Sequence, residues 1–256
     1  MKIHPTAIVS AKAELSDGVE VGPYSIVGDN LKIGANTRID SHVVLAGWTT
    51  IGSGCQIFPG AVIGTIGQDV KFKETKNYVE VGDNTIVREY VTINRPTGPE
   101  GYTRVGKNVF LLAYSHVAHE CEVGDSVVMA NAATIAGHVT VEEGAVIGGL
   151  TGIHQFCKIG KFAMIGGASR VIKDVLPYTV AAGNPAKIGG LNTVGLNRRG
   201  FSQDEIATLK KAYRLIFRSK LNVSQAVERI QAELKPSPHL EHLLNFINNC
   251  ERGIAK

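Results

Sequence analysis

Aliphatic side chains recur at every sixth position along most of this chain, all in one phase. Two residues before each of them stands a second recurring position, which is small or β-branched in nearly every repeat. Because residues two apart point to the same side of a β-strand, each such pair predicts a short strand with one buried side. Glycine follows many of the aliphatic residues and permits a tight corner there. The pattern therefore predicts short strands separated by corners.

The six-residue pattern is interrupted twice without losing its phase. It covers residues 3–63, returns over 81–93, and returns again over 105–171. The gaps near residues 65–80 and 94–104 span whole multiples of six, so we expect two loops extruded from one unbroken stack. The stretches IGANTR and IGSGCQ resemble the repeats of hexapeptide proteins. That resemblance implies an all-β solenoid, a left-handed parallel β-helix in which three hexapeptides make one triangular coil.

A different period begins near the end of the chain. Ser202 and Glu205 form a capping box, and the apolar residues that follow are spaced as on a helix. Two further helical patterns come after it, the second beyond a Pro-Ser-Pro stretch. We therefore expect a β-helix over residues 1–186 and a small C-terminal α-helical domain over 187–256.

The four cysteines predict neither a disulfide nor a metal site. Cys55, Cys121 and Cys157 each occupy the small inner position of a repeat, and Cys250 lies in the helical segment. We expect the first three to pack in the core as small apolar side chains.

Composition and charge narrow the class of protein. The 256 residues are 44% hydrophobic and 20% charged, with no apolar run long enough to cross a membrane and no signal-peptide pattern. We expect a cytoplasmic protein without a transmembrane segment. The formal net charge is +4, and residues 187–220 hold eight Lys or Arg against two acidic residues. This cluster suggests an anionic partner, although a solvated basic face fits equally well; a single Trp argues against nucleic acid.

Titratable side chains gather in the segment AYSHVAHECEVG. If one coil is 18 residues long, positions 18 apart stack at the strand spacing of about 4.8 Å. His119 then stacks with Gly137 and, one coil further, with Gln155. By the same arithmetic Glu120 stacks with His138. The segment is therefore one of several polar segments that stack along one edge of an otherwise apolar β-helix.

Four of the eight histidines fall along this edge, because His154 precedes Gln155 and His116 points outward toward the same region. A single histidine on a corner is usually a surface residue, whereas four in register favour a site. A neutral imidazole suits proton abstraction, and Glu120 can orient it. The residues alone leave three classes open: a metal-free acyltransferase, a zinc carbonic anhydrase with three histidines across a subunit boundary, and a non-catalytic scaffold.

Six segments carry a resemblance to a known family: IGQDVKF, SHVAHECEVG, IAGHVTVEEGAVIGG, GIHQFCKIG, AAGNPAK and GLNRRGF. With the helical C-terminus, they resemble the UDP-N-acetylglucosamine acyltransferases that begin lipid A synthesis, over nearly the whole chain. The resemblance implies transfer of a 3-hydroxyacyl chain from acyl carrier protein to UDP-N-acetylglucosamine. It also implies a homotrimer with sites between subunits, and neither a cofactor nor a metal.

The same resemblance implies roles for individual residues. His119 matches the general base, Glu120 matches its acidic partner, where the family often has Asp, and Gly137 matches the oxyanion donor. Gly167 matches the position that limits acyl length and, lacking a side chain, implies a long groove. The positions that match substrate-binding residues are Asp69, Lys71, His116, His138, His154, Gln155, Asn192, Arg198 and Arg199.

One departure and one close rival accompany this interpretation. Relatives often have His-Arg-Gly-Thr where this chain has Asn94-Arg95-Pro96-Thr97. The rival is a sister enzyme that N-acylates a later glucosamine intermediate; it normally carries an extra N-terminal uridine-binding domain, whereas the hexapeptides here begin at residue 3. The acyl length stays open, as does the choice between a 3-hydroxyl and a 3-amino acceptor.

Overall fold

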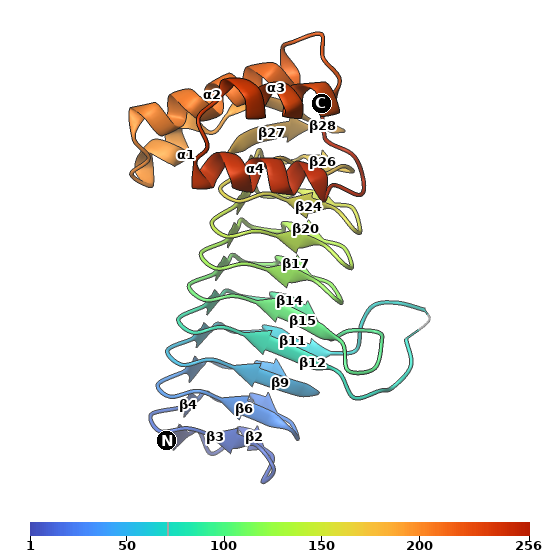
Figure 1. Cartoon of the computed structure of the whole chain (residues 1–256). Coiled ribbons are helices and arrows are strands. Elements are labelled where there is room, and N and C mark those ends of the chain that lie inside the picture. The colour runs from blue at the N-terminus through green and yellow to red at the C-terminus, as the bar shows by residue number, and fades with distance from the viewer. Residues whose placement is uncertain (71) are drawn as a thin grey trace.

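The computed structural model describes residues 1–70 and 72–256. A long β-helix begins with the N-terminus at one end and carries the helices at the other (Figure 1). Each coil contributes one short strand to each of three sheets, which form the three faces of a prism. The predicted parallel β-helix is therefore confirmed, whereas Lys71 of the predicted site lies outside the described residues.

The first face is the largest sheet. Its strands, in order, are β1 (Lys2–Ile3), β4 (Glu20–Val21), β7 (Arg38–Ile39), β10 (Gln56–Ile57), β13 (Ile86–Val87), β16 (Phe110–Leu111), β19 (Val128–Met129), β22 (Val146–Ile147), β25 (Met164–Ile165), β27 (Thr179–Gly183) and β28 (Ala186–Leu191). All neighbours are parallel except β27 and β28, which form an antiparallel pair at the end of the sheet. The predicted domain boundary falls where β28 begins, and it stays a prediction.

The other two faces are wholly parallel. The second face consists of β2 (Ile8–Val9), β5 (Ile26–Val27), β8 (Val44–Leu45), β11 (Val62–Thr65), β14 (Thr92–Asn94), β17 (His116–Val117), β20 (Thr134–Ile135), β23 (Gly152–Ile153) and β26 (Arg170–Val171). The third face consists of β3 (Glu14–Leu15), β6 (Leu31–Ile33), β9 (Trp48–Ile51), β12 (Tyr78–Val81), β15 (Tyr102–Val105), β18 (Glu122–Val123), β21 (Thr140–Val141) and β24 (Lys158–Ile159).

Strand register explains why the two interruptions leave the stack intact. In a regular coil a residue pairs with the one 18 positions on, as Val105 does with Val123. The offset is 30 between Ile51 and Val81 and 24 between Val81 and Val105, so the loops add twelve and six residues. Both loops leave the prism at the corner between the second and third faces, where one of them projects far from the coil (Figure 1).

The corners are occupied mainly by residues with positive φ, and each corner has its own chemistry. The asparagine corner, between the third and first faces, includes Asn36, Asn84, Asn108, Gly144 and Phe162. The aromatic corner, between the first and second faces, includes Tyr24, Tyr90, Tyr114 and Leu150, all exposed. The site corner, between the second and third faces, includes Glu120, His138 and Phe156.

The inner positions fill the prism with aliphatic side chains. Cys55, Cys121 and Cys157 lie there with no accessible surface, and all are free thiols, which confirms the packing prediction. Burial raises the pKa of Cys121 to about 12 and that of Cys157 to about 11. Neither thiol is therefore a nucleophile near neutral pH.

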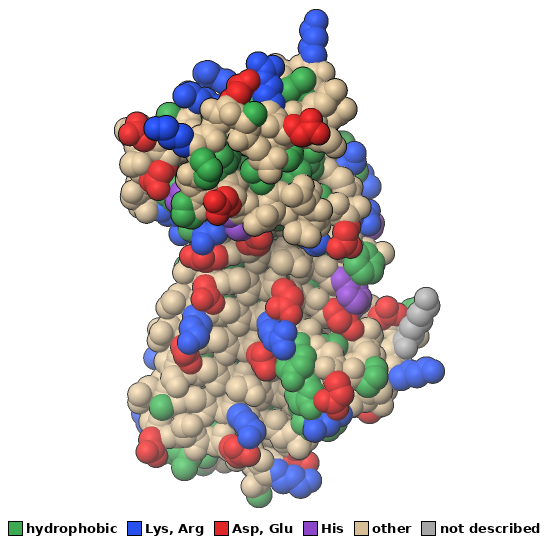
Figure 2. Space-filling model, in the orientation of Figure 1, with side chains coloured by type: hydrophobic (Ala, Val, Ile, Leu, Met, Phe, Trp, Pro, Cys, Tyr) green, Lys and Arg blue, Asp and Glu red, His purple; other side chains and the backbone are tan. Residues whose placement is uncertain are grey.

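The outward side chains differ between the faces. The third face carries charges of both signs, and Arg104 forms ion pairs there with Glu80 and Glu122. Figure 2 shows rows of acidic and basic side chains on the prism below the helices. Outward apolar residues on the first face are Ile86, Phe110, Val128, Val146 and Met164. Those on the second face are Ile8, Ile26, Val44 and Val62.

Four helices close the far end of the prism: α1 (Thr193–Arg198), α2 (Gln203–Phe217), α3 (Val223–Glu233) and α4 (Pro238–Asn248). The predicted capping box of Ser202 and Glu205 is present at α2. Apolar residues of the helices pack with Phe162, Leu176 and Tyr178 of the last coil to form a second core. No helix in the described part of the chain has the length and apolar character needed to span a membrane.

Residues near the C-terminus return to the β-helix. Ile254 forms a parallel bridge with Asp174, and Ala255 is only 3% exposed. The Asp174 carboxylate also accepts a hydrogen bond from the backbone N–H of Lys158 at 2.8 Å. This short segment extends the third face beyond β24, so the edge of that sheet is covered.

Candidate active site

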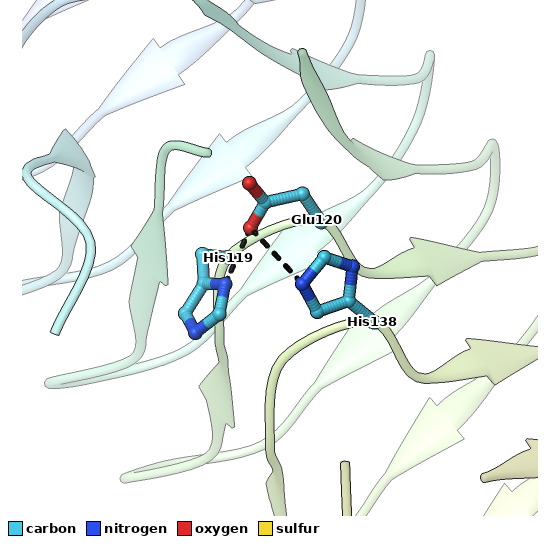
Figure 3. Close-up of side chains that lie close together, drawn as sticks. All are labelled: His119, Glu120 and His138. Atoms are coloured by element: carbon cyan, nitrogen blue, oxygen red, sulfur yellow. Dashed lines mark hydrogen bonds and ion pairs between the residues drawn. The ribbon is translucent and has the colours of Figure 1, made fainter. Parts of the chain in front are cut away.

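His119 lies at the site corner, two residues after β17, with Glu120 and His138 beside it (Figure 3). Its Nδ1 is hydrogen bonded to Glu120 Oε2. Because an ionised carboxylate only accepts, Nδ1 carries the proton and Nε2 keeps its lone pair. Nε2 has no hydrogen-bond partner among the described residues. The imidazole is therefore held in the tautomer that a general base requires.

Gly137 lies directly against the His119 ring. A Cβ at residue 137 would lie 2.3 Å from Cε1 and 2.6 Å from Nε2 of His119, so only glycine leaves room for the imidazole. Within the described chain, the Gly137 N–H donates no hydrogen bond. A backbone amide without a partner in the described residues, on the residue that packs against the imidazole, is the kind of donor that an acyl-transfer intermediate needs.

Glu120 is held on its second oxygen by the shorter of the two extruded loops. Its Oε1 accepts hydrogen bonds from Thr97 N at 2.7 Å, Thr97 Oγ1 at 2.8 Å and Gly98 N at 3.2 Å. Burial alone would raise the pKa of the Glu120 carboxyl, but hydrogen bonds from Thr97, His119 and Gly98 outweigh it and leave the pKa below its ordinary value. Glu120 is therefore ionised at neutral pH and supports a protonated imidazole.

His138 stands one coil beyond Glu120 in the same corner. Its ring is stacked on Phe156 with centroids 4.6 Å apart, and its Nε2 lies 4.0 Å from Glu120 Oε2. The rings of His119 and His138 meet edge to face at 5.4 Å. His138 thus has a fixed orientation toward the carboxylate while remaining exposed on its outer side.

The same three residues are the group that could bind a metal ion. His119, Glu120 and His138 each offer one ligand atom, and these atoms lie within 4.8 Å of one another. This geometry also suits proton transfer without a metal, because Glu120 already orients His119. The expected absence of a metal stays a prediction.

Comparison with known proteins assigns the chain to a family. A family model described as "Udp N-acetylglucosamine O-acyltransferase; Domain 2" matches residues 174–255, and a bacterial transferase hexapeptide model of six repeats matches residues 30–65. An acyl-[acyl-carrier-protein]--UDP-N-acetylglucosamine O-acyltransferase from Thermodesulfovibrio yellowstonii is 51% identical over 100% of this chain and 99% of its own length. One from Syntrophobacter fumaroxidans is 45% identical over the full length of both.

Solved structures agree with these relatives. The UDP-N-acetylglucosamine O-acyltransferase of Moraxella catarrhalis superimposes with a TM-score of 0.97 at 43% identity, covering 100% of both chains. The Acinetobacter baumannii LpxA structure gives 0.96 at 42% identity, covering 99% of both.

This chain belongs to the UDP-N-acetylglucosamine O-acyltransferase family. Its fold is accordingly the left-handed parallel β-helix with a small C-terminal helical part, as expected from the sequence. The relatives' names do not favour the sister N-acyltransferase, the zinc carbonic anhydrase or the scaffold.

Other residues matched to this acyltransferase family lie near His119 to different extents. His116 is on β17, with its Nδ1 2.6 Å from Thr92 Oγ1. Burial, and to a smaller extent the proximity of His119, lowers the pKa of His116, so this imidazole is neutral at pH 7. His154 and Gln155 occupy the site corner one coil beyond His138 and are exposed. The corner thus continues outward from His119 as an open polar surface.

The two extruded loops meet over the site. Gly67, in the longer loop, lies so close to His119 that a Cβ there would be 3.4 Å from His119 Cβ. Asn94 donates through Nδ2 to Thr65 Oγ1 at 3.1 Å and to Ile66 O at 3.0 Å, which ties the start of one loop to the other. Asp69 is half-buried in the longer loop. The family-matched loop residue Asp69 is therefore on a segment anchored beside the base.

Three basic or amide residues matched to nucleotide contacts lie at another corner of the same chain. Asn192 caps α1 by accepting from Gly195 N and donates to Phe162 O at 2.9 Å. Arg199 donates to Gly144 O at 2.7 Å, and its guanidinium stacks on Phe162 at 4.3 Å. Gly144 and Phe162 belong to the asparagine corner. Within one chain, Asn192 and Arg199 are thus not beside His119, and Arg198 is exposed on the same helix.

Gly167 likewise lies away from the site corner. It precedes Ala168 at the turn between β25 and β26, which is part of the aromatic corner. A Cβ there would meet Gly149 O at 3.3 Å and otherwise has room. A groove from His119 to Gly167 therefore has to cross the second face and cannot follow a single corner.

Sequence reasoning missed two residues of the site, Thr97 and Phe156. Phe156 was within reach, because it stands 18 positions after His138. Thr97 lies on a loop outside the repeat, so stacking arithmetic gives no information about its position.

Proposed function

We propose that this chain transfers a 3-hydroxyacyl group from acyl carrier protein to the 3-position of UDP-N-acetylglucosamine, the first step of lipid A biosynthesis. The observation that carries the proposal is the His119 ring packed against Gly137 with Glu120 bound to Nδ1, while neither His119 Nε2 nor the Gly137 N–H has a hydrogen-bond partner among the described residues. Family membership supplies the identity of donor and acceptor.

The geometry supports direct transfer with His119 as general base. Nε2 removes the proton of the sugar hydroxyl, and the oxygen attacks the thioester carbonyl. The Gly137 N–H stabilises the negative oxygen of the tetrahedral intermediate, while Glu120 stabilises the imidazolium. When the intermediate collapses, the thiol leaves and takes the proton back from His119. No covalent acyl-enzyme is needed, and no described cysteine has the ionised thiol that one would require.

A homotrimer is supported by the chemistry of the faces. The aromatic corner lies between the two faces that carry apolar outward rows, whereas the third face is charged. Three prisms with their aromatic corners at a common axis place the first face of one copy against the second face of the next. This covers both apolar rows, that of the second face in the N-terminal coils and that of the first face in the later coils. The site corner of each copy then lies beside the asparagine corner of its neighbour.

This arrangement gives the separated residues a common site. Asn192, Arg198 and Arg199 of one copy lie beside His119 of the next, where their positive charge suits the diphosphate of the nucleotide. His116, His138, His154, Gln155, Asp69 and Lys71 are proposed to complete the substrate pocket. The remaining basic residues of the helical part suit an acidic carrier protein. Four free thiols fit a reducing compartment, so we place the reaction in the cytoplasm.

The decisive experiment compares wild type with His119→Ala in transfer from 3-hydroxyacyl carrier protein to UDP-N-acetylglucosamine. Loss of the base lowers kcat by about 10² to 10⁴-fold, while nucleotide binding, measured by calorimetry, is retained. Near-wild-type turnover in the variant contradicts the mechanism. Running the same panel with a 3-amino acceptor and donors of several lengths decides which acceptor and which chain this enzyme prefers.

A further inference from the structure

Glu120 Oε1 has an unusually complete set of donors for an acid at a solvent-facing corner. Thr97 provides two of the three hydrogen bonds, one from its backbone and one from its hydroxyl, and Gly98 provides the third. Oε1 is therefore occupied by the loop, and Oε2 is the oxygen presented to His119. A carboxylate held at one oxygen in this way cannot rotate without losing charge-assisted hydrogen bonds.

The segment that carries Thr97 is itself fixed by the longer loop. Asn77, which has no accessible surface, donates through Nδ2 to Pro96 O at 2.7 Å. The backbone N–H of Glu100 donates to Lys76 O at 2.7 Å. On the other side, Gly67 packs so closely that a Cβ would lie 3.3 Å from Thr97 Cγ2. The Thr97 hydroxyl is thus delivered to Glu120 by a preformed scaffold built from both loops.

Arg95 anchors the same scaffold to the prism. Its side chain is 8% exposed, forms an ion pair with Glu74 at 2.8 Å, and lies over the rings of Trp48 at 5.9 Å and Phe72 at 5.4 Å. Trp48 belongs to β9 of the coil, whereas Glu74 and Phe72 belong to the longer loop. The loops are therefore attached to the coil independently of Glu120. The hydrogen bonds from Thr97 are not needed to hold the loops and can act on the orientation of Glu120 and His119.

We propose that Thr97 is a positioning residue of the reaction, which orients Glu120 so that its Oε2 holds His119 in the base tautomer. This inference rests on the proposed function, since it concerns the same base.

The test compares Thr97→Val, which keeps the shape and the backbone N–H but removes the hydroxyl, with Thr97→Ser, which restores it. Thr97→Val is expected to lower kcat about tenfold, which corresponds to one lost charge-assisted hydrogen bond, with KM for the sugar nucleotide unchanged. Thr97→Ser should recover most of the loss. A matched control is Thr140→Val, on the third face away from both loops, which should leave kcat unchanged.

A double-mutant cycle separates positioning from loop stability. In a Glu120→Ala background, Thr97→Val should cause no further loss, because the oxygen that the hydroxyl holds is already gone. An equal loss in both backgrounds overturns the proposal, as does a rise in KM without a fall in kcat.

A third readout needs no turnover. The ¹⁵N shifts of His119 in ligand-free protein should report one fixed tautomer in wild type and Thr97→Ser, and a tautomer mixture in Thr97→Val. Identical shifts in all three overturn the positioning role. If wild type transfers no acyl group, the proposed function fails, and these shifts still decide whether Thr97 orients the dyad.

Discussion

Glycine at position 137 sets the place of the His119 ring, because any side chain there would occupy the space of the imidazole. Gly137→Ala should therefore push His119 away from Gly137 and from Glu120. Displacement of a reacting group by about 1 Å costs on the order of 10²-fold in rate, so we expect kcat to fall by about that factor while the fold persists. The measurement is steady-state kinetics together with the thermal unfolding midpoint.

Gly190→Ala is the matched control for this substitution, since no atom lies within 4 Å of a Cβ at residue 190. It should leave both kcat and the unfolding midpoint near wild type. Undiminished activity in Gly137→Ala would show that the imidazole does not need its present position over the glycine.

Residue placement could be predicted where the repeat applies and not beyond it. The 18-residue coil correctly places His119 over Gly137 and Glu120 next to His138, because inner positions cannot slip without exposing the core. Thr97 could not be found in this way, since a loop outside the repeat is positioned by tertiary contacts alone. The separation of Arg199 from His119 could not be predicted either, because a cluster of basic residues in the sequence does not tell at which corner of the prism they lie.

For the secondary-structure elements, the constant phase of the six-residue repeat explains why the strands could be predicted. The two insertions contain whole multiples of six, so the inner positions after each loop point inward again, and the strands could be placed through the gaps. The capping box predicted the start of α2, whereas α1 was missed. Helix α1 has six residues, too few to display a period, and its only local signal was the cap at Asn192.

A path from His119 to Gly167 crosses the second face, and the proposal that the acyl chain follows it makes Gly167 a test of acyl length. Its Cβ position is open apart from Gly149 O at 3.3 Å, so Gly167→Met is expected to fold and to place a side chain at the aromatic corner. Long donors should lose contacts worth about 0.8 kcal/mol per methylene, and overpacking costs ~1 to 3 kcal/mol more. The ratio of kcat/KM for long and short 3-hydroxyacyl donors should therefore shift toward short ones.

Two results would contradict a path of the acyl chain from His119 to Gly167. An unchanged ratio places the acyl chain elsewhere, and equal losses for both donors mean that the substitution only damages the corner. Gly190→Met, at an open position on β28, is the control for a methionine added away from the second face.

For the whole molecule, the separation of His119 and Arg198 on different corners predicts a site shared between copies. His119→Ala and Arg198→Ala proteins should each be nearly inactive. When they are unfolded together and refolded as mixed trimers, some interfaces combine an intact His119 with an intact Arg198 from the neighbour. Random association gives about a quarter of the sites both groups, so activity should return to about a quarter of wild type.

Mixing the folded proteins without exchange of subunits is the control, and it should restore nothing. If the refolded mixture is also inactive, His119 and Arg198 do not act across an interface. Sedimentation of the refolded mixture verifies that trimers have formed.

The helices cover only one end of the prism, and this asymmetry has a consequence for how the molecule opens. Each coil touches only the coils above and below it, so stability passes from neighbour to neighbour along the stack. The first coil leaves the inner residue Ile3 44% exposed, whereas the last coil is covered by the helical core. Unfolding should therefore start at the N-terminal coil and proceed coil by coil toward the helices.

Native-state amide exchange measures this directly, because protection should rise along the hydrogen-bonded amides from Ile8 and Ile26 toward Thr140 and Val146. Uniform protection along the prism would instead indicate a single cooperative unit. If the gradient is present, His119 and Gly137 sit in coils that open late. The first coils can then unfold and refold while the site corner stays folded.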